Sequence, residues 1–175
     1  QNEMLDTIYT LVMTPQGQLL SGQYSGVYAH HNSQPVSLYD NLDLATYPPT
    51  TALAISTSGD YMIGGVEGGV LYSTDSGQTW KGAQFQLPPS LISCIRLSPQ
   101  FEQDRAIIVG TLDDGIYRST DGGESWEPSN IGLFDRQVLC MAVTSDRLLM
   151  VGTETGLYQS ANVGRLWHAI ETPYA

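Results

Sequence analysis

The sequence predicts an all-β fold built from about four repeated units, each made of four short antiparallel strands. A glycine-headed segment recurs as GVYAHHN from Gly26, GVLYSTD from Gly69, GIYRSTD from Gly115 and GLYQSAN from Gly156, at spacings of 43, 46 and 41 residues. Short runs of β-branched and aromatic residues stand between turn residues, and no stretch has the apolar spacing that a helix needs. Four-stranded units at this period are typical of the blades of a β-propeller.

Each unit has its strands in the same order. A first apolar run (IYTLVMT, TALAIST, LISCIRLS or QVLCMAVT) precedes a second one (QLLS, YMIG, AIIV or LLMV), and the glycine-headed segment supplies the third strand. The fourth strand follows a turn that ends on tryptophan in three of the units. We therefore expect a single domain over residues 1–175, with blades at about 1–46, 47–88, 89–134 and 135–175.

The turn before the fourth strand is almost the same octet in two units, STDSGQTW and STDGGESW. In the first copy, Asp75 can accept hydrogen bonds from the backbone N–H groups ahead of it, and Gly77 can adopt a positive φ without steric cost. Ser73 and Thr79 flank the turn, where their hydroxyls can bond across it. Trp80 is a large apolar plate that we expect to cover the end of the blade and the next blade.

The pattern S-x-D-x-G-x-[ST]-W resembles the Asp-box, or BNR repeat, of sialidases, sortilin, some glycoside hydrolases and the propellers of photosystem II assembly factors. A third copy, SANVGRLW, has Asn162 and Leu166 in place of Asp and Thr, and the copy that begins at His30 has lost the glycine and the tryptophan. The resemblance implies a folding device on the face away from any active site, and it does not imply sialidase activity. The box residues are Ser73, Asp75, Gly77, Thr79, Trp80, Ser119, Asp121, Gly123, Ser125, Trp126, Ser160, Asn162, Gly164 and Trp167.

The amino-acid composition limits the kinds of partner. Hydrophobic residues make up 41% of the 175 residues, which suits one domain with a core, and 18 acidic against 7 basic residues give a net charge of −11. Phosphate binding needs clustered Lys and Arg, so we expect no nucleic acid and no anionic membrane surface as a partner. No apolar run approaches the roughly 18 residues of a spanning helix, so we expect no membrane insertion. The charge fits a basic protein or a cation, or it serves solubility alone.

Acidic and aromatic residues gather in the predicted turns opposite the boxes. In a propeller these turns share a face with the connections between blades, so the side chains would surround the central opening. They fit a binding face for a basic or hydroxyl-rich partner, or ordinary solvated turns; a glycosidase would also need two carboxylates about 5–10 Å apart. The candidate binding residues are Tyr24, Tyr47, Glu67, Asp113, Asp114, Phe134, Asp135 and Glu154, with Asp40 and Asp43 in the connections.

Other residue types give weaker indications of chemistry. The resemblance implies three arginines in a sialidase site, but only Arg96 falls on an innermost strand. Adjacent residues His30 and His31 point to opposite faces of a strand, so we expect no metal site. We expect no cofactor either, because no phosphate-binding loop opens a helix. Cys94 and Cys140 occupy matching innermost strands and are expected to be small buried residues, with a disulfide between them as the alternative.

Four blades leave the closure of the ring open. Propellers of the resembled family have six, seven or ten blades, so the chain would be a partial ring, half of a ring that two copies complete by self-association, or a small closed ring. Its start at Gln1 fits a processed chain or a piece of a longer protein. The loop at 99–106 interrupts the repeat, either as a contact loop or as a simple insertion.

These patterns together favour a binding role. We expect a non-catalytic interaction or recognition module, alone or within a larger protein, that binds a protein or a glycan on the face opposite the boxes. The alternative is a carbohydrate-active enzyme, a glycoside hydrolase of sialidase-like architecture. An assembly chaperone like the photosystem factors ranks lower, because the resemblance implies an arginine-rich surface that this acidic chain lacks.

Overall fold

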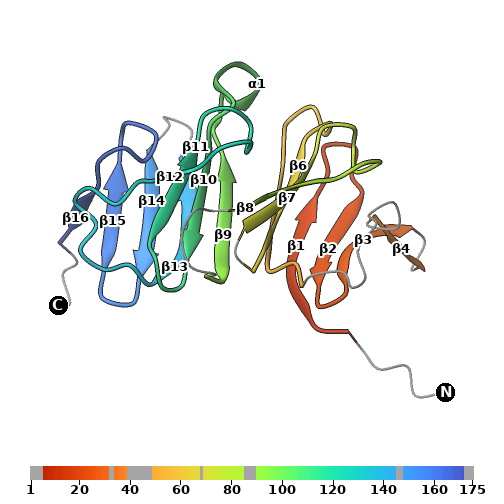
Figure 1. The fold of residues 1–175 in the computed structure, drawn as a ribbon, viewed down its shortest axis with the longest axis horizontal. Helices are drawn as coiled ribbons and strands as arrows, with labels where there is room; N and C mark the ends of the chain where they lie inside the picture. The colour runs from red at the N-terminus through yellow and green to blue at the C-terminus, as the bar shows by residue number, and fades with distance from the viewer. Residues whose placement is uncertain are drawn as a thin grey trace.

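Four separate sheets make up the protein. The structure, a computed structural model, describes residues 6–31, 34–38, 49–67, 69–84, 90–144 and 148–171. Each of the four sheets has four antiparallel strands that are consecutive in the chain. Figure 1 shows the sheets following one another from the first at the right to the last at the left. The predicted fold class, an all-β protein of four-stranded antiparallel blades, is therefore confirmed.

Within each sheet the strands pair in chain order. The first sheet contains β1 (Ile8–Met13), β2 (Leu19–Gln23), β3 (Gly26–His31) and β4 (Gln34–Ser37), and the second contains β5 (Ala52–Ile55), β6 (Met62–Val66), β7 (Gly69–Ser73) and β8 (Lys81–Gln84). The third contains β9 (Ile92–Leu97), β10 (Ile107–Thr111), β11 (Ile116–Ser119) and β12 (Glu127–Pro128), and the fourth contains β13 (Val138–Val143), β14 (Leu149–Thr153), β15 (Leu157–Ser160) and β16 (His168–Ile170). The first strands lie in a row, because β1 contacts β5, β5 contacts β9 and β9 contacts β13.

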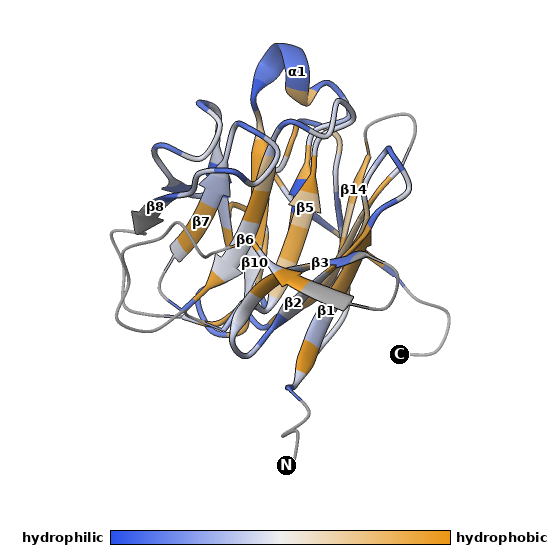
Figure 2. Ribbon diagram, turned by 90° about the vertical axis from the view of Figure 1, so that its right-hand side faces the viewer, coloured by the Kyte–Doolittle hydropathy of each residue, from blue (hydrophilic) through white to orange (hydrophobic). Residues whose placement is uncertain are grey.

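The hydrophobic core lies between the sheets. Leu20 of the first sheet packs in one cluster with Leu53 of the second, and two further clusters join the second sheet to the third and the third to the fourth. Figure 2 shows this pattern as orange apolar strand residues between bluer loops at the strand ends. Because each sheet buries apolar side chains against its neighbours, burial between sheets is the main stabilising contribution to the fold.

A glycine in the second strand allows the next sheet to approach closely, as the second and third sheets show. A Cβ on Gly65 would lie 2.6 Å from Cγ2 of Ile92 in the third sheet, and a Cβ on Gly110 would lie 2.5 Å from Cγ1 of Val138 in the fourth. Non-bonded carbon atoms prefer to lie roughly 3.5–4.0 Å apart, so any side chain at these positions would push the sheets apart.

One short helix interrupts the strands, so the prediction of no helical stretch is wrong at this point. The loop at 99–106 contains α1 (Phe101–Asp104), a single turn that ends at Arg105 with φ 51°. Phe101 is buried, and its ring centroid lies 4.6 Å from that of Tyr61 in the second sheet. The guanidinium of Arg105 stacks over Phe101 at 4.7 Å from the ring centroid. The loop therefore packs the second and third sheets together.

The tryptophans of the box turns pack in the opposite direction from the one expected. Trp80 lies in the cluster that the second sheet shares with the preceding sheet, beside Leu20 and Val27. The turn itself also packs toward the preceding sheet, since a Cβ on Gly77 would lie 3.3 Å from Cδ1 of Leu38, which directly follows β4. The expectation that Trp80 covers the next blade is therefore wrong.

Candidate functional site

In the first box hairpin, the carboxylate of Asp75 accepts hydrogen bonds from residues of the same hairpin. Oδ1 of Asp75 accepts from the hydroxyl of Ser73 at 2.7 Å and from the N–H of Thr79 at 2.8 Å, and Oδ2 accepts from the hydroxyl of Thr79 at 2.6 Å. The two hydroxyls thus bond to the carboxylate and not to each other. Gly77 has φ 83°, and its carbonyl accepts from Nε1 of Trp80 at 3.1 Å. Because both carboxylate oxygens of Asp75 accept bonds from the hairpin itself, the hairpin has a structural role.

The second box hairpin repeats these contacts. Oδ1 of Asp121 accepts from the hydroxyl of Ser119 at 2.8 Å and from the N–H of Ser125 at 3.0 Å. Nε1 of Trp126 donates to the carbonyl of Gly123 at 3.0 Å. The recurrence indicates an architectural role for the octet.

The third box hairpin keeps the turn with different side chains. Oδ1 of Asn162 accepts from the hydroxyl of Ser160 at 2.8 Å and from the N–H of Leu166 at 3.0 Å. The N–H of Gly164 donates to the hydroxyl oxygen of Ser160 at 3.1 Å. Leu166 has no hydroxyl, so the additional bond made by Thr79 in the first hairpin is lost. Nε1 of Trp167 donates to a carbonyl of the preceding sheet.

The ionised carboxylates of the first two box hairpins make the stability of the protein depend on pH. Hydrogen bonds from Thr79, followed by that from Ser73, lower the pKa of Asp75 to about 2. Burial opposes ionisation of Asp121, but hydrogen bonds from Ser125 outweigh it, so the pKa of Asp121 is also lowered. A carboxyl group whose pKa is lowered by folding stabilises the fold above its unfolded pKa of about 3.9, and this contribution is lost as the pH falls toward the folded value. We expect the Tm from circular dichroism to fall between about pH 4 and pH 2.

A variant of the first hairpin provides the control. Asp75→Asn imitates the third hairpin and cannot ionise, so the decline of its Tm over this pH range should be shallower than that of the wild type. Identical declines for the two proteins would mean that Asp75 contributes nothing to the pH dependence.

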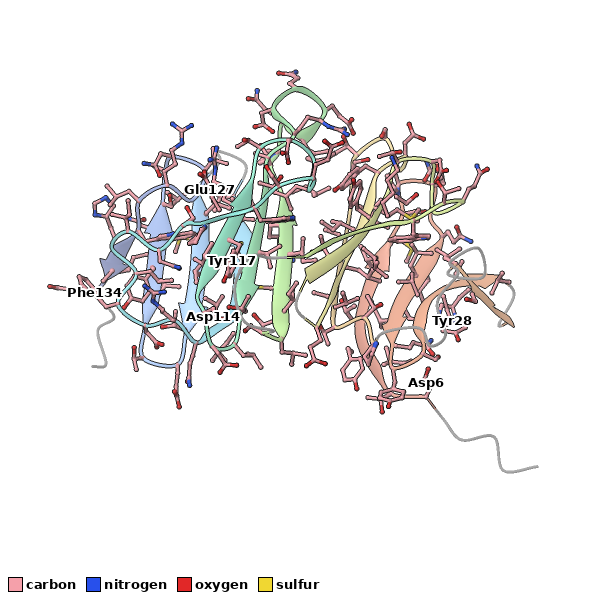
Figure 3. The ribbon with its side chains drawn as sticks, in the orientation of Figure 1. Asp6, Tyr28, Asp114, Tyr117, Glu127 and Phe134 are labelled. Carbon is pink, nitrogen blue, oxygen red and sulfur yellow. The ribbon has the colours of Figure 1, made fainter. Side chains whose placement is uncertain are left out.

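Carboxylates from three consecutive sheets lie on the edge opposite the box hairpins, here named the acidic edge. Glu67 lies in the β6–β7 turn, Asp113 and Asp114 lie in the β10–β11 turn, and Glu154 lies in the β14–β15 turn. Figure 3 shows Asp114 at the lower edge, at the opposite end of the strands from α1 in Figure 1. Glu67, Asp113 and Glu154 are exposed, and Asp114 is half-buried. Within the part of the chain that the structure describes, the single ion pair lies elsewhere, so none of the four has a cation partner.

The aromatic candidates lie far from one another. Tyr24, in the β2–β3 turn, is 61% exposed, and Phe134, in the β12–β13 connection, is 88% exposed. In Figure 3 Phe134 lies at the far end of the last sheet, well away from the labelled aspartate of the acidic edge. Tyr47 and the two connection residues Asp40 and Asp43 lie outside the described residues. The described aromatics therefore form no continuous surface.

Asp135 anchors a connection between sheets. Its Oδ2 accepts from the N–H and the hydroxyl of Thr155 at 2.8 and 2.7 Å, and its Oδ1 accepts from the N–H of Gln137 at 2.9 Å. These bonds, led by that from the Thr155 hydroxyl, lower the pKa of Asp135 to about 2. Asp6 makes the same kind of contact in the first sheet, where its Oδ2 accepts from the N–H of Ser25 at 3.1 Å. Sequence reasoning missed the pair Asp6–Ser25, because aligning the repeated units at the turn glycine places Asp6 one position out of register with Asp135.

The four innermost strands line a shared groove. One part of it, of about 310 Å³, lies beside Val12, Ala54 and Leu97, and a second part, of about 190 Å³, lies beside Thr10 and Ser93. An exposed arginine at position 96 lines both parts and donates to its neighbour's backbone carbonyl at 2.7 Å. No carboxylate is among the described residues that line either part.

The cysteines differ from the expectation. Both are free; Cys94 is buried, and burial raises the pKa of its thiol, whereas Cys140 is exposed and the expectation that it is buried is wrong. Cys94 packs in the cluster that joins the third and fourth sheets, whereas Cys140 lies in the last of the four described sheets. His30 lies 2.7 Å from the hydroxyl of Ser21 through Nε2, a contact within the first sheet. Over the described ranges, we find neither a cluster of three or more potential metal ligands nor a helix capable of crossing a membrane.

Similar proteins are found by structure. No family model and no curated protein matches the sequence. The structure resembles YCF48, solved bound to a D1 peptide, over 97% of this chain with a TM-score of 0.70 and 13% identity. The chain has a β-propeller fold.

This propeller also resembles larger proteins. The extracellular domain assigned to a one component system of B. thetaiotaomicron matches over 98% of this chain with a TM-score of 0.74 and 15% identity. An ancestral GH74 enzyme matches over 93% with a TM-score of 0.70 and 12% identity. The chain spans 55% of the YCF48 chain, 22% of the extracellular domain and 25% of the GH74 enzyme. At these identities the likeness concerns the fold alone.

Proposed function

We propose that this propeller is a non-catalytic interaction module that binds a positively charged protein segment at the acidic edge. The observation that carries the proposal is the placement of Glu67, Asp113, Asp114 and Glu154 on one edge, without a cation partner in the described structure. The net charge of −11 attracts a cationic segment over a distance and speeds its encounter. Short turns on packed sheets hold these charges at fixed spacings, which gives selectivity for a partner with matching charges.

Binding of a peptide is compatible with this fold. YCF48, which shares the architecture, was solved with a bound D1 peptide. Exposed Tyr24 and Phe134 offer this chain an aromatic contact near each end of the row of sheets. Aromatic side chains are favoured at protein interfaces because they bury a large area with few rotatable bonds.

A carbohydrate-active enzyme is the second candidate, since an ancestral GH74 enzyme shares the fold. Such an enzyme needs two carboxyl groups on either side of the glycosidic bond. Asp135 fits this role poorly, because its oxygens accept hydrogen bonds and its pKa of about 2 leaves no proton to donate near neutral pH. We expect no turnover of aryl glycosides. Turnover that Glu67→Gln, Asp113→Asn or Glu154→Gln abolishes would favour the enzyme instead.

Removal of charge from the acidic edge is expected to weaken the binding of a lysine-rich peptide. Glu67→Gln combined with Glu154→Gln removes two exposed carboxylates of that edge, and we expect the Kd from calorimetry at low salt to rise about tenfold. The matched control, Glu102→Gln combined with Glu124→Gln, removes two exposed carboxylates from the α1 and box side and should change the Kd much less. Equal losses in both double variants would indicate attraction by net charge alone. Binding of neutral oligosaccharides in place of the peptide would transfer the proposal to a glycan ligand.

A further inference from the structure

Strand β1 leaves uncovered a row of apolar side chains at one end of the molecule. Ile8, Leu11 and Met13 are 54%, 59% and 59% exposed. Three large apolar side chains at this exposure on one strand are unusual for a sheet that packs in layers.

The same positions are covered in the other three sheets. Equivalent positions are counted from the residue that pairs with the second-strand glycine. They are Leu53 and Ile55 of the second sheet with Thr50 just before β5, then Ile92, Ile95 and Leu97 in the third, and Val138, Met141 and Val143 in the fourth. The equivalents of Leu11 are Leu53, Ile95 and Met141, which are only 7%, 0% and 3% exposed. Each of these three packs in the cluster shared with the preceding sheet. Strand β1 therefore presents one half of a sheet-to-sheet contact.

The last sheet presents the other half. Met150 and Leu157 are half-buried and Cys140 is exposed. The equivalents of Met150 are Leu20, Ile63 and Ile108, those of Leu157 are Val27, Val70 and Ile116, and those of Cys140 include Ala52 and Cys94. All of these equivalents are at most 7% exposed, because the following sheet covers them, and Thr10, the equivalent of Cys140 in the first sheet, is half-buried.

The second-strand glycine of the last sheet supports the same reading. A Cβ on Gly65 or Gly110 would meet an atom of the next sheet within 2.6 Å, and a Cβ on Gly22 would lie 2.6 Å from the carbonyl oxygen of Thr50, just before β5. A Cβ on Gly152 would meet only Sγ of Cys140, which belongs to its own sheet, at 2.8 Å. The last sheet thus has the open space beside its second-strand glycine, but no side chain of another described sheet fills that space.

One contact of the inner junctions has no counterpart at the ends. The hydroxyl of Thr51 donates to the carbonyl of Ile92 at 2.6 Å, and the hydroxyl of Ser93 donates to the carbonyl of Val138 at 2.6 Å. The equivalent residue of the last sheet is Leu139, which has no hydroxyl. The first sheet has Tyr9 in that position and still packs onto the second, so a junction forms without this hydroxyl contact.

We propose that strand β1 of one copy packs onto strands β13–β15 of a second copy, continuing between two chains the sheet-to-sheet contact that occurs three times within one. A second copy is the fitting occupant because each chain carries both complementary halves, including the open space beside the second-strand glycine of one and the protruding Ile8 of the other. Two such contacts related by a twofold axis close a ring of eight sheets, which is within the range known for propellers.

The mass of the chain in solution tests this contact. Multi-angle light scattering of residues 1–175 should give about twice the 19.1 kDa of one chain at about 100 µM, a concentration that populates interfaces of micromolar Kd. The thiol of Cys140 should react more slowly with a soluble disulfide reagent as association proceeds. A strict monomer at this concentration, with a reaction rate of Cys140 independent of concentration, would overturn the proposal.

Two variants distinguish this head-to-tail contact from a dimer in which the same face of each chain meets. Leu11→Asp disables the β1 half and Cys140→Glu disables the β13 half; both side chains are exposed in the single chain, so circular dichroism and Tm at low concentration should remain near those of the wild type. Each variant alone should be monomeric, whereas an equimolar mixture should form a dimer through the remaining intact halves. Ile131→Asp, which replaces another exposed apolar residue, should keep the wild-type mass. Dimers of either variant alone, or a mixture of folded variants that stays monomeric, would contradict the contact.

Discussion

Replacing Trp167 with alanine is expected to lower the free energy of unfolding by about 3–5 kcal/mol. The side chain is 1% exposed and packs in the cluster between the third and fourth sheets, beside Ile108 and Leu133. Its Nε1 donates to the carbonyl of Ser129 at 2.8 Å. Alanine would leave a cavity between the sheets and a buried carbonyl without its donor, and both effects destabilise the fold. Urea unfolding at low protein concentration, followed by circular dichroism, measures the change.

The tryptophan of the second box hairpin supplies the control. Trp126 is half-buried, and its Nε1 bonds within its own hairpin at 3.0 Å. Trp126→Ala should therefore cost less than Trp167→Ala, because it removes less buried area. A loss under about 1 kcal/mol for Trp167→Ala would show that the neighbouring sheets close the cavity by moving together.

The strand order of the fold could be predicted because its determinants are local and repeated. Each turn glycine and each apolar run recurs at nearly constant spacing, so weak strand signals add up over four units. The hydrogen bonds of Asp75 also lie within its own octet, where side-chain chemistry and spacing are sufficient to place them.

Features that depend on neighbouring sheets could not be predicted in the same way. The direction in which Trp80 packs depends on how the hairpin leans toward the first sheet, and the exposure of Cys140 depends on which sheets pack against β13. The helix α1 has four residues, too few for an apolar period to be visible. The Asp135–Thr155 bond joins residues 20 positions apart, so no single turn motif contains it.

In the candidate site, too, some positions follow from the local sequence and others depend on long-range contacts. The turns that carry Glu67, Asp113 and Glu154 follow directly from the strand order, which puts every second turn at one edge. Phe134 is different, because its connection passes the outer end of the last sheet, where the carbonyl of Ile131 accepts from the N–H of Trp167 at 2.8 Å. Its distance from the carboxylates is set by that long-range contact and by no feature of its own segment.

Adding one methyl group at Gly110 is expected to destabilise the fold by about 1–3 kcal/mol, the usual cost of overpacking a close contact. The new Cβ would lie 2.5 Å from Cγ1 and 3.2 Å from Cβ of Val138, and 2.7 Å from Sγ of Cys94. Rotation of the Val138 side chain moves Cγ1 but does not move its Cβ. The contact between Cβ of Val138 and the new Cβ at position 110 therefore remains, and the third and fourth sheets must separate. Denaturant unfolding of Gly110→Ala against the wild type measures the loss.

Gly156→Ala adds the same methyl group where no atom lies within 4 Å of it. This variant should be neutral or slightly more stable than the wild type, because alanine loses less conformational entropy on folding than glycine does. A destabilisation of similar size at both positions would mean that the spacing between sheets does not determine the cost. A loss confined to Gly110→Ala would instead establish the second-strand glycine as the element that sets how closely consecutive sheets pack, which is the same spacing that the proposed contact between two chains requires.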